Sequence, residues 1–434
     1  VELDALPAGA GAGWRLLPAV APRAAVAEAA IAAAAARLGL DCRITFNPPA
    51  SGTFYACVRD HRRQGSAAHF YRIEVGIAPV AINIGESVPG RLSEIFGVAV
   101  PRGRRNATIV RATGLVAADK AKITYEALPA GMTASNAAFQ ANLFAPVVFS
   151  ASSAAELRAG LATPKTTIAK GRRARQSAHR HSYPVIRIGN NQIYASQTAN
   201  ALPVAITDPV PFDLKVIAPK VPIVRSGSLS LPISLTRAKG FTGTVSVRAL
   251  ALPAGVSTST VRLTGKNLAG NMAINANSRA ALGESPVVLV ASASIGGVTR
   301  TISTDILTLN IEEPWVTATV PKTKIERGMT GTFALDLTHR QEFDGAITAK
   351  LGRIPKGVTC TVPKITKGMT KLPIKIEIAK DAPVGRHRYI YVQLKIKTKD
   401  GVITHNVGSG EIRVDKPIPP EPPTAPGSAT KGQL

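Results

Sequence analysis

The chain has 434 residues, of which 45% are hydrophobic and 5% aromatic, and its 53 Lys and Arg against 27 Asp and Glu give a formal charge of +26. This length exceeds what one hydrophobic core supports and predicts three or four domains. No segment reaches the roughly 18 to 20 apolar residues of a membrane-spanning helix. Three cysteines, Cys42, Cys57 and Cys360, are too few for a disulfide framework. The charge predicts attraction to polyanions such as nucleic acid, acidic polysaccharide or an anionic envelope surface.

Residues 1–39 differ in composition from the rest of the chain. An Ala-rich stretch from Arg23 to Leu38 follows Pro22 and ends at Gly39. Proline before a helix and glycine after it predict a short helix here. Its alanines offer little surface to bury, so disorder stays open as the alternative, and the role of this segment is left open.

Residues 40–76 are the first stretch with a β pattern, in which apolar residues alternate with polar ones. Three strands are predicted: Leu40–Phe46, Thr53–Arg59 and Phe70–Val75. The alternation places Cys42 toward the core and Cys57 away from it. Free thiols are therefore favoured, although a bond between these two cysteines stays open.

One phrase occurs three times in the later part of the chain. Its copies are Leu128-Pro129-Ala130-Gly131, Leu252-Pro253-Ala254-Gly255 and Ile354-Pro355-Lys356-Gly357. The last two copies lie 102 residues apart (354 − 252), and further landmarks keep this offset: Arg225 and Arg327, Phe241 and Phe343, Ala280 and Ala382. A repeat of about a hundred residues predicts duplicated β-sandwiches. Because Pro fixes φ and Gly permits a turn, we expect each phrase to form a structural corner.

The repeats divide the chain after residue 76. The predicted modules are 77–210, 211–313 and 314–415, and a Pro-rich tail occupies 416–434. The first module is longer because it contains a basic insertion, 163–182, which lacks periodicity and is expected to be an exposed loop. After the insertion, two alternating stretches flank a Gly-Asn-Asn turn and predict a hairpin: Tyr183–Ile188 and Gln192–Ala195.

Two parts of the chain resemble bacterial families. The first match is carried by Leu40-Asp41-Cys42-Arg43-Ile44-Thr45-Phe46, Gly52-x-Phe54, Val58-Arg59-Asp60 and Phe70-Tyr71-Arg72-Ile73-Glu74-Val75. With these residues, 40–76 resembles the end of a pre-peptidase C-terminal (PPC) domain, a β-sandwich appended to secreted peptidases and large surface proteins and usually non-catalytic. The second match is carried by Val100-Pro101-Arg102-Gly103, Pro211-Phe212, Gly240-Phe241-x-Gly243 and the repeated phrases. It makes 77–415 similar to the Ig-like repeats that follow such domains in large exported proteins.

These resemblances imply an all-β fold. Tandem Ig-like β-sandwiches would follow a partial PPC-like β-domain and the short N-terminal Ala-rich helix. They also imply a secreted or cell-envelope location in a bacterium, outside the cytoplasm.

The basic insertion contains the best candidate binding site, because no acidic residue lies between Arg158 and Thr207. The candidate polyanion-binding residues are Lys170, Arg172, Arg173, Arg175 and Arg180. Arginine forks suit sulfate, phosphate and carboxylate groups. The alternatives are a solvated loop, a site for acidic glycan or envelope polymer, and a nucleic-acid site. Nucleic acid is disfavoured because few aromatic residues interleave with the arginines.

No catalytic or metal-binding motif is present, neither a G-x-S-x-G elbow nor HExxH, a P-loop or Cys-x-x-Cys. Asp60-His61 lies near two serines, but nothing there orients a nucleophile. His179 and His181 are close in sequence, but the arginines around them disfavour a metal cation, so a solvated loop is expected. No catalytic residue, metal site or cofactor is predicted.

The sequence therefore predicts a non-catalytic, extracellular or envelope-associated structural and adhesive module of a larger exported bacterial protein, with affinity for anionic polysaccharide. An alternative is the targeting or substrate-binding appendage of a secreted peptidase or glycan hydrolase whose catalytic domain lies upstream. A periplasmic nucleic-acid binder is a third hypothesis. The specific ligand and the oligomeric state are left open.

Overall fold

The computed structural model describes residues 2–3, 16–18, 54–55, 80–84, 97–140, 142–168, 177–188 and 192–417. The chain divides into two units, Val1–Ala78 and Pro79–Leu434. The described part of the first unit is a sheet of three short strands: β1 (Glu2–Leu3), β2 (Leu16–Pro18) and β3 (Phe54–Tyr55). Several predicted features lie outside the described residues: the helix at Arg23–Leu38, the strands Leu40–Phe46 and Phe70–Val75, the thiols of Cys42 and Cys57, and the tail beyond residue 417.

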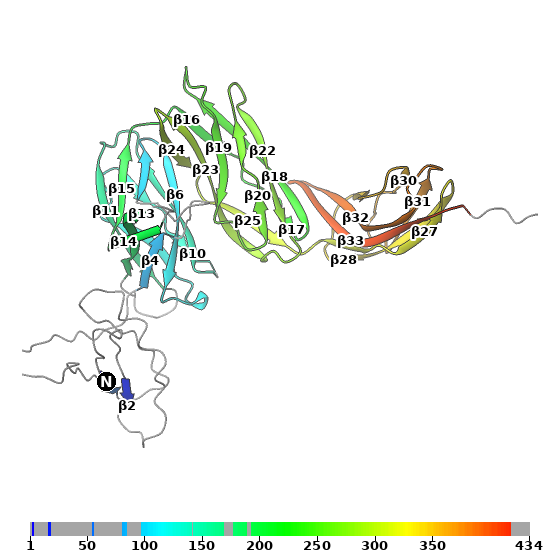
Figure 1. Ribbon diagram of the computed structural model, residues 1–434, viewed down its shortest axis with the longest axis horizontal. Coiled ribbons are helices and arrows are strands. Elements are labelled where there is room, and N and C mark those ends of the chain that lie inside the picture. The colour runs from blue at the N-terminus through cyan, green and yellow to red at the C-terminus, as the bar shows by residue number, and fades with distance from the viewer. Residues whose placement is uncertain are drawn as a thin grey trace, which may run out of the picture. The chain divides into compact units, whose positions relative to one another are not determined.

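The second unit begins with a sandwich of two five-stranded sheets (Figure 1). One sheet has the order β12 (Ser177–His179), β4 (Val80–Ile84), β6 (Arg105–Thr113), β10 (Phe144–Ala151), β8 (Met132–Ala134). The other has the order β5 (Val98–Pro101), β15 (Leu202–Thr207), β11 (Ala159–Thr167), β7 (Lys122–Glu126), β9 (Ala137–Ala138). The remaining elements are a separate hairpin, β13 (His181–Ile188) with β14 (Gln192–Ala199), and one 3-10 turn, η2 (Ala117–Asp119).

The second sandwich follows directly in the chain. Its first layer contains β16 (Phe212–Val216), β18 (Gly227–Arg237), β22 (Ala269–Ala276) and β20 (Val256–Thr258). Its second layer contains β17 (Ile223–Val224), β25 (Leu307–Glu312), β23 (Gly283–Ile295), β24 (Val298–Ser303), β19 (Val245–Leu250) and β21 (Val261–Leu263).

The third sandwich repeats this layout. Its first layer contains β26 (Val316–Thr319), β28 (Thr330–His339), β31 (Lys371–Ile378) and β30 (Val358–Thr361). Its second layer contains β27 (Lys322–Glu326), β33 (Gly401–Asp415), β32 (Gly385–Thr398) and β29 (Thr348–Gly352). The strands β22 and β31 begin 102 residues apart (371 − 269), as do β23 and β32 (385 − 283). The prediction of an all-β fold of tandem sandwiches is confirmed.

Alternating side chains explain why these segments form strands. In β31 the buried residues are Leu372, Ile374, Ile376 and Ile378, and every residue between them is exposed. A period of two with one apolar face is the pattern of a strand that covers a core on one side. The buried residues of the second and third sandwiches form a single contiguous hydrophobic cluster, whereas the first sandwich has its own.

The repeated phrase forms the same corner in all three sandwiches. The residue before each copy is left-handed, with φ of 55° at Ala127 and 60° at Ala251 and Arg353. The glycine that ends each copy is left-handed too, with φ of 80° at Gly131 and 79° at Gly255. The predicted structural corner is therefore confirmed, and glycine is needed because other residues rarely adopt this backbone.

A second turn packs against each corner. Asn277 N donates to Gly255 O at 2.9 Å, and Ala280 N donates to Asn277 O at 3.2 Å. A Cβ on Gly255 would lie 2.6 Å from Cα of the fully buried Ala280. Arg225 Nε closes the turn by donating to Ala280 O at 2.8 Å. Three landmarks that share one offset in the sequence, Arg225, the repeated phrase and Ala280, thus meet at one place in the fold.

Contact with this second turn distinguishes Gly255 from Gly240, which is left-handed too. Gly240 has φ of 88°, but nothing lies within 4 Å of its Cβ position. We expect Gly240→Ala to lose about 1 kcal/mol of unfolding free energy from backbone strain alone. Gly255→Ala also crowds the added methyl group against Ala280 and should lose roughly 2 to 4 kcal/mol of unfolding free energy. Urea unfolding of the full chain measures both, and equal losses would contradict the packing of the two turns.

Candidate functional site

The second and third sandwiches share one eight-stranded sheet. Its central order is β20-β22-β18-β33-β32-β29, with β16 on β18 and β27 on β33. The two sandwiches meet where Gly227 and Ser228 pair with His405 and Thr404. Asn406 N also donates to Ser226 O at 2.9 Å. The strand β33 can reach β18 because β16 covers only the opposite half of β18, from Ile233 to Arg237.

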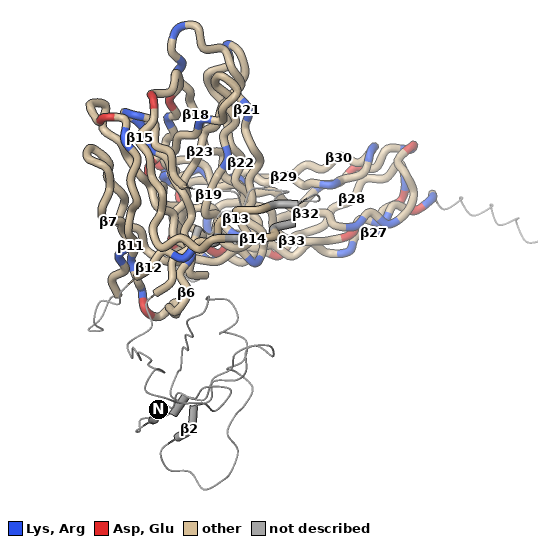
Figure 2. The backbone as a smooth tube through the Cα atoms, turned by 60° about the vertical axis from the view of Figure 1, so that its left-hand side comes forward, with Lys and Arg blue, Asp and Glu red and all other residues tan. Residues whose placement is uncertain are grey.

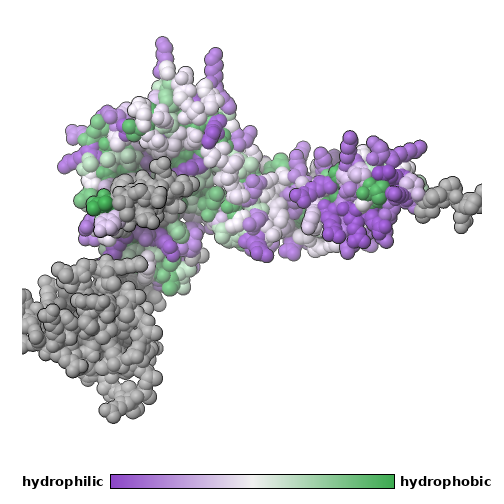
Figure 3. Space-filling view, in the orientation of Figure 1, coloured by the Kyte–Doolittle hydropathy of each residue, from purple (hydrophilic) through white to green (hydrophobic). Residues whose placement is uncertain are grey.

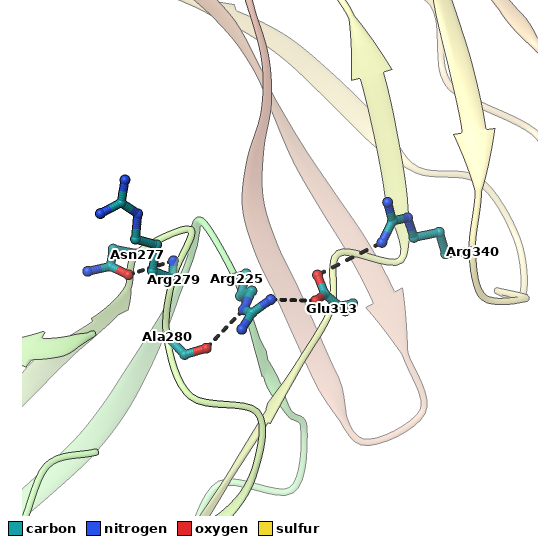
Figure 4. Close-up of polar contacts among 6 residues, drawn as sticks. All are labelled: Arg225, Asn277, Arg279, Ala280, Glu313 and Arg340. Carbon is teal, nitrogen blue, oxygen red and sulfur yellow. Dashed lines mark hydrogen bonds and ion pairs between the residues drawn. The ribbon is translucent and has the colours of Figure 1, made fainter. Parts of the chain in front are cut away.

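Side chains reinforce this joint on the side of the linker (Figure 4). Arg225, from the second sandwich, donates through Nη1 to Glu313 Oε1 at 2.5 Å. The other oxygen of Glu313 lies 3.9 Å from Nη1 of Arg340, which belongs to the third sandwich. One linker carboxylate therefore connects an arginine from each sandwich. Because Glu313 and Arg340 are substantially exposed, each ion pair contributes at most about 1 kcal/mol.

Partly buried contacts hold the rest of the linker. Glu312 accepts hydrogen bonds from Asn310 Nδ2 at 2.8 Å and from Trp315 Nε1 at 3.0 Å. On the other side of the joint, the Nε2 atom of the buried His405 lies 3.1 Å from Val316 O. Burial lowers the pKa of His405, which keeps the ring neutral. The linker is thus attached to both sandwiches.

The first and second sandwiches meet differently, through an apolar contact between sheet faces. A small buried cluster joins Ala107 and Val148 of the first sandwich to Leu250, Val288 and Val290 of the second. Polar contacts lie beside it: Arg105 Nε to Asp305 Oδ1 at 2.8 Å, and Arg104 Nε to Asp213 Oδ1 at 3.6 Å. The strand β23 is buried on both faces at this place.

A polar depression lies at the seam of the shared sheet. It has a volume of about 440 Å³, and its lining includes Ser228, Asn275, Gln393 and Asn406. These residues alternate with buried ones along their strands, so they belong to the outer face of the sheet. Amides and hydroxyls both donate and accept hydrogen bonds, which suits a ligand with many hydroxyl groups.

Most of the predicted polyanion site lies outside the described residues. This holds for Lys170, Arg172, Arg173 and Arg175. Arg180 is described and half-buried between β12 and β13, and its backbone N donates to Ile82 O at 2.6 Å. Arg180 is the one member of this set in the described part of the chain, and the site stays a prediction.

The expectation that 163–182 is one exposed loop is wrong. Residues 163–167 belong to β11 and pair with β7, and Ser177–His179 forms β12, which adds to β4 in parallel. In β11 the buried residues are Ala162, Pro164 and Thr166. These buried side chains are small or only weakly apolar. They alternate with exposed residues, but they are not hydrophobic enough to predict a strand from the sequence. The hairpin predicted after this segment is confirmed as β13 and β14.

The expectation of a solvated loop around His179 and His181 is also wrong. His179 is fully buried and His181 is 8% exposed, and their ring centroids are 6.2 Å apart. Among the described residues, neither nitrogen of His179 has a hydrogen-bond partner. Burial, with a smaller contribution from His181, lowers the pKa of His179 to about 4. Burial also lowers the pKa of His181.

Other chemistry is sparse within the described residues. They contain no group of three or more His, Cys, Asp or Glu side chains placed to hold a metal ion. Cys360 is free, and burial raises its pKa to about 11, so its thiol is protonated and unreactive at neutral pH. No helix in this part of the chain has the length and apolar character needed to cross a membrane.

The contacts that join the sandwiches, the apolar cluster and the strand pairing, were not predicted from the sequence. The signal for the first was the unbroken apolar run Val287-Val288-Leu289-Val290-Ala291, because a strand buried on both faces lacks alternation. The seam between β18 and β33 gave no such signal. It is formed by backbone atoms of Gly, Ser, Thr and His, and the side chains of these residues do not indicate a strand pairing.

No protein-family model and no curated protein matches the chain. Many solved structures are similar to it, among them the following two. Fibronectin(III)-like modules of CbhA from Clostridium thermocellum match at 17% identity over 47% of this chain and 95% of theirs, with a TM-score of 0.17. Domains 4–9 of the surface layer protein SbsC match at 13% identity over 72% of this chain and 43% of theirs, with a TM-score of 0.19. These values are too low to transfer either neighbour's role.

Burial of His179 makes the first sandwich sensitive to acid. Its folded pKa is about 4 against 6.5 when solvated, so the unfolded chain binds more protons and stability falls as the pH drops from 6.5 toward 4. The loss should reach roughly 3 kcal/mol at the low end of this window. His179→Phe should abolish this part of the acid sensitivity.

Urea unfolding at about pH 7 and about pH 4.5 measures this loss of stability, with hydrogen exchange of β4 and β6 as the readout for the first sandwich. The matched control is His387→Phe in the third sandwich, which should leave the acid loss of β4 and β6 unchanged. An acid loss that is the same in His179→Phe as in the parent chain would contradict the assignment.

Proposed function

We propose that the chain is a non-catalytic, rigid structural and adhesive module of a larger exported bacterial protein. The observation that carries this proposal is the shared sheet, because it makes the second and third sandwiches continuous in backbone pairing and in core. A string of independent domains would be joined by flexible linkers with few contacts across them. Here the linker itself is bonded to both sides.

The contact between the first and second sandwiches supports the same role. Val288 and Val290 are at most 1% exposed although they lie on the outer face of their own sandwich. Exposing such residues would cost roughly 1.5 to 3 kcal/mol each, which favours the joined state. Residues 80–417 then act as one spacer that holds whatever is attached to it at a set distance.

The adhesive part of the proposal rests on charge. The chain has a formal charge of +26, which favours contact with anionic polymers. Basic residues are concentrated in the sequence around Arg172 and Arg173. The location outside the cytoplasm rests on the resemblance of residues 40–76 to a PPC domain. An acidic envelope polysaccharide is the partner that fits both.

The rigidity can be measured in the full chain. We replace Cys42, Cys57 and Cys360 by Ser and place spin labels at Lys266→Cys in the second sandwich and Lys380→Cys in the third. Double electron–electron resonance should give a single narrow distance distribution. Arg225→Ala with Glu313→Ala should broaden it, and Gly227→Val more so, because a Cβ on Gly227 would lie 2.7 Å from Thr404 O.

A pair of labels within the second sandwich, Lys239→Cys with Lys266→Cys, provides the control width. The distribution between sandwiches should be as narrow as this control in the parent chain. A distribution several times broader than the control would overturn the proposal of a rigid spacer. An unchanged width in Gly227→Val would show that the shared sheet is not its cause.

A further inference from the structure

We propose that the outer face of the shared sheet is a binding site for an acidic polysaccharide. In this arrangement the sugar hydroxyls form hydrogen bonds with the polar residues of the seam, and the sugar carboxylates form ion pairs with Lys350, Lys395 and Lys397. This site consists of other residues than the basic segment around Arg172. It deepens the proposed adhesive role and rests on it for the class of ligand.

Strand register brings polar residues into continuous rows across both sandwiches. One row crosses six strands through directly paired residues: Thr348, Lys395, Thr404, Ser228, Asn275 and Ser257. A second row beside it contains Lys350, Gln393 and Asn406. Neighbouring strands lie about 4.8 Å apart, so the longer row extends for roughly 24 Å. This length suits an extended chain of several sugars.

The three lysines form a compact positive group on this face. Lys395 and Lys397 are two residues apart on β32, and Lys350 is diagonal to Lys395 on β29. Diagonal positions on adjacent strands are about 7 to 8 Å apart. All three side chains are exposed, and no carboxylate lies within 4.0 Å of them in the described part of the chain.

The opposite sheet of the third sandwich provides a contrast. Three lysines on this sheet or in the turn beside it have acidic partners: Lys367 Nζ is 3.1 Å from Glu342, Lys371 Nζ is 3.9 Å from Asp336, and Lys375 Nζ is 2.7 Å from Glu377. Figure 2 shows Lys and Arg interspersed with Asp and Glu along this sandwich, and Figure 3 shows its strongly hydrophilic surface. Basic residues are therefore common on both faces, but the outer face of the shared sheet leaves these three without a counter-ion.

The chemistry of the seam favours polysaccharide over nucleic acid. Single-stranded nucleic acid requires exposed aromatic rings on which bases stack. Tyr391, on the same face, has its ring packed against Gly352, where a Cβ would lie 2.3 Å from Cζ. Tyr389 is exposed, but Arg353 covers its ring at 6.0 Å from the centroid. Amides and hydroxyls around the depression at the seam remain available for sugar hydroxyls.

The test uses fluorescent polygalacturonate oligomers as the acidic probe, with neutral dextran and single-stranded DNA as competitors. Affinity is measured across a salt series, in the parent chain and in a background with Lys170, Arg172, Arg173 and Arg175 replaced by Gln. The background variant prevents the other basic segment from hiding a change. Lys350→Gln with Lys395→Gln and Lys397→Gln should weaken binding at least about tenfold and reduce the salt dependence.

The matched control removes the same number of charges from the opposite sheet and the turn beside it: Lys367→Gln with Lys371→Gln and Lys375→Gln. It should change affinity less than about twofold if the site is local. Asn275→Ala with Gln393→Ala and Asn406→Ala should weaken binding without changing the salt dependence. Equal losses in the two lysine variants, equal binding of dextran, or tighter binding of DNA would each overturn the proposal.

The spin-label measurement separates this proposal from the proposed rigid spacer. Broad distances between sandwiches with polygalacturonate binding intact would remove the spacer and leave the binding face. Narrow distances with no polygalacturonate binding would remove the binding face and leave the spacer.

Discussion

A short stretch of backbone pairing, in which Gly227 and Ser228 meet His405 and Thr404, connects the two duplicated sandwiches into one body. Few residues take part, but the pairing has a large effect because it extends a sheet rather than joining two surfaces. Hydrophobic side chains beneath it then merge into a single core. A hinge at this place would have to break backbone hydrogen bonds and divide a core at once.

Glycine makes this approach of two strands feasible. A side chain at Gly227 would meet the carbonyl oxygens of Val224 and Thr404, both within 3 Å of its Cβ position. The same requirement recurs at Gly408 and Gly410, which lie against Val320. Close packing of β33 against its neighbours thus depends on residues that carry no side chain. This strand combines the parts that correspond to β24 and β25 of the second sandwich into one longer element.

The corners could be predicted from the sequence, because Pro129, Gly131 and their counterparts act through local backbone geometry. The repeat could be predicted because its landmarks keep one offset. Arg225 was visible as a landmark, but its contacts with Ala280 and Glu313 join residues far apart in the chain and follow only from the fold.

The strand β11 and the buried His179 were missed for a related reason. Pro164, Thr166 and histidine are buried there by long-range packing, against their own average preference for solvent.

The proposed ligand face depends on the same long-range pairing. Lys350 and Gln393 are 43 residues apart (393 − 350) and Asn275 is still further away, yet the register places them on adjoining rows. Neither their spacing nor their composition distinguishes them from other polar residues in the sequence. If the seam opened, the row would be divided at Ser228 and Thr404.

Hydrogen exchange at the amide of Asn406 tests the shared sheet most directly, because this amide donates across the seam to Ser226 O. In a continuous sheet this amide should exchange within about tenfold of the rate of Ile403, inside the β32–β33 ladder. Exchange as fast as that of the exposed turn at Gly296 and Gly297 would contradict a continuous sheet.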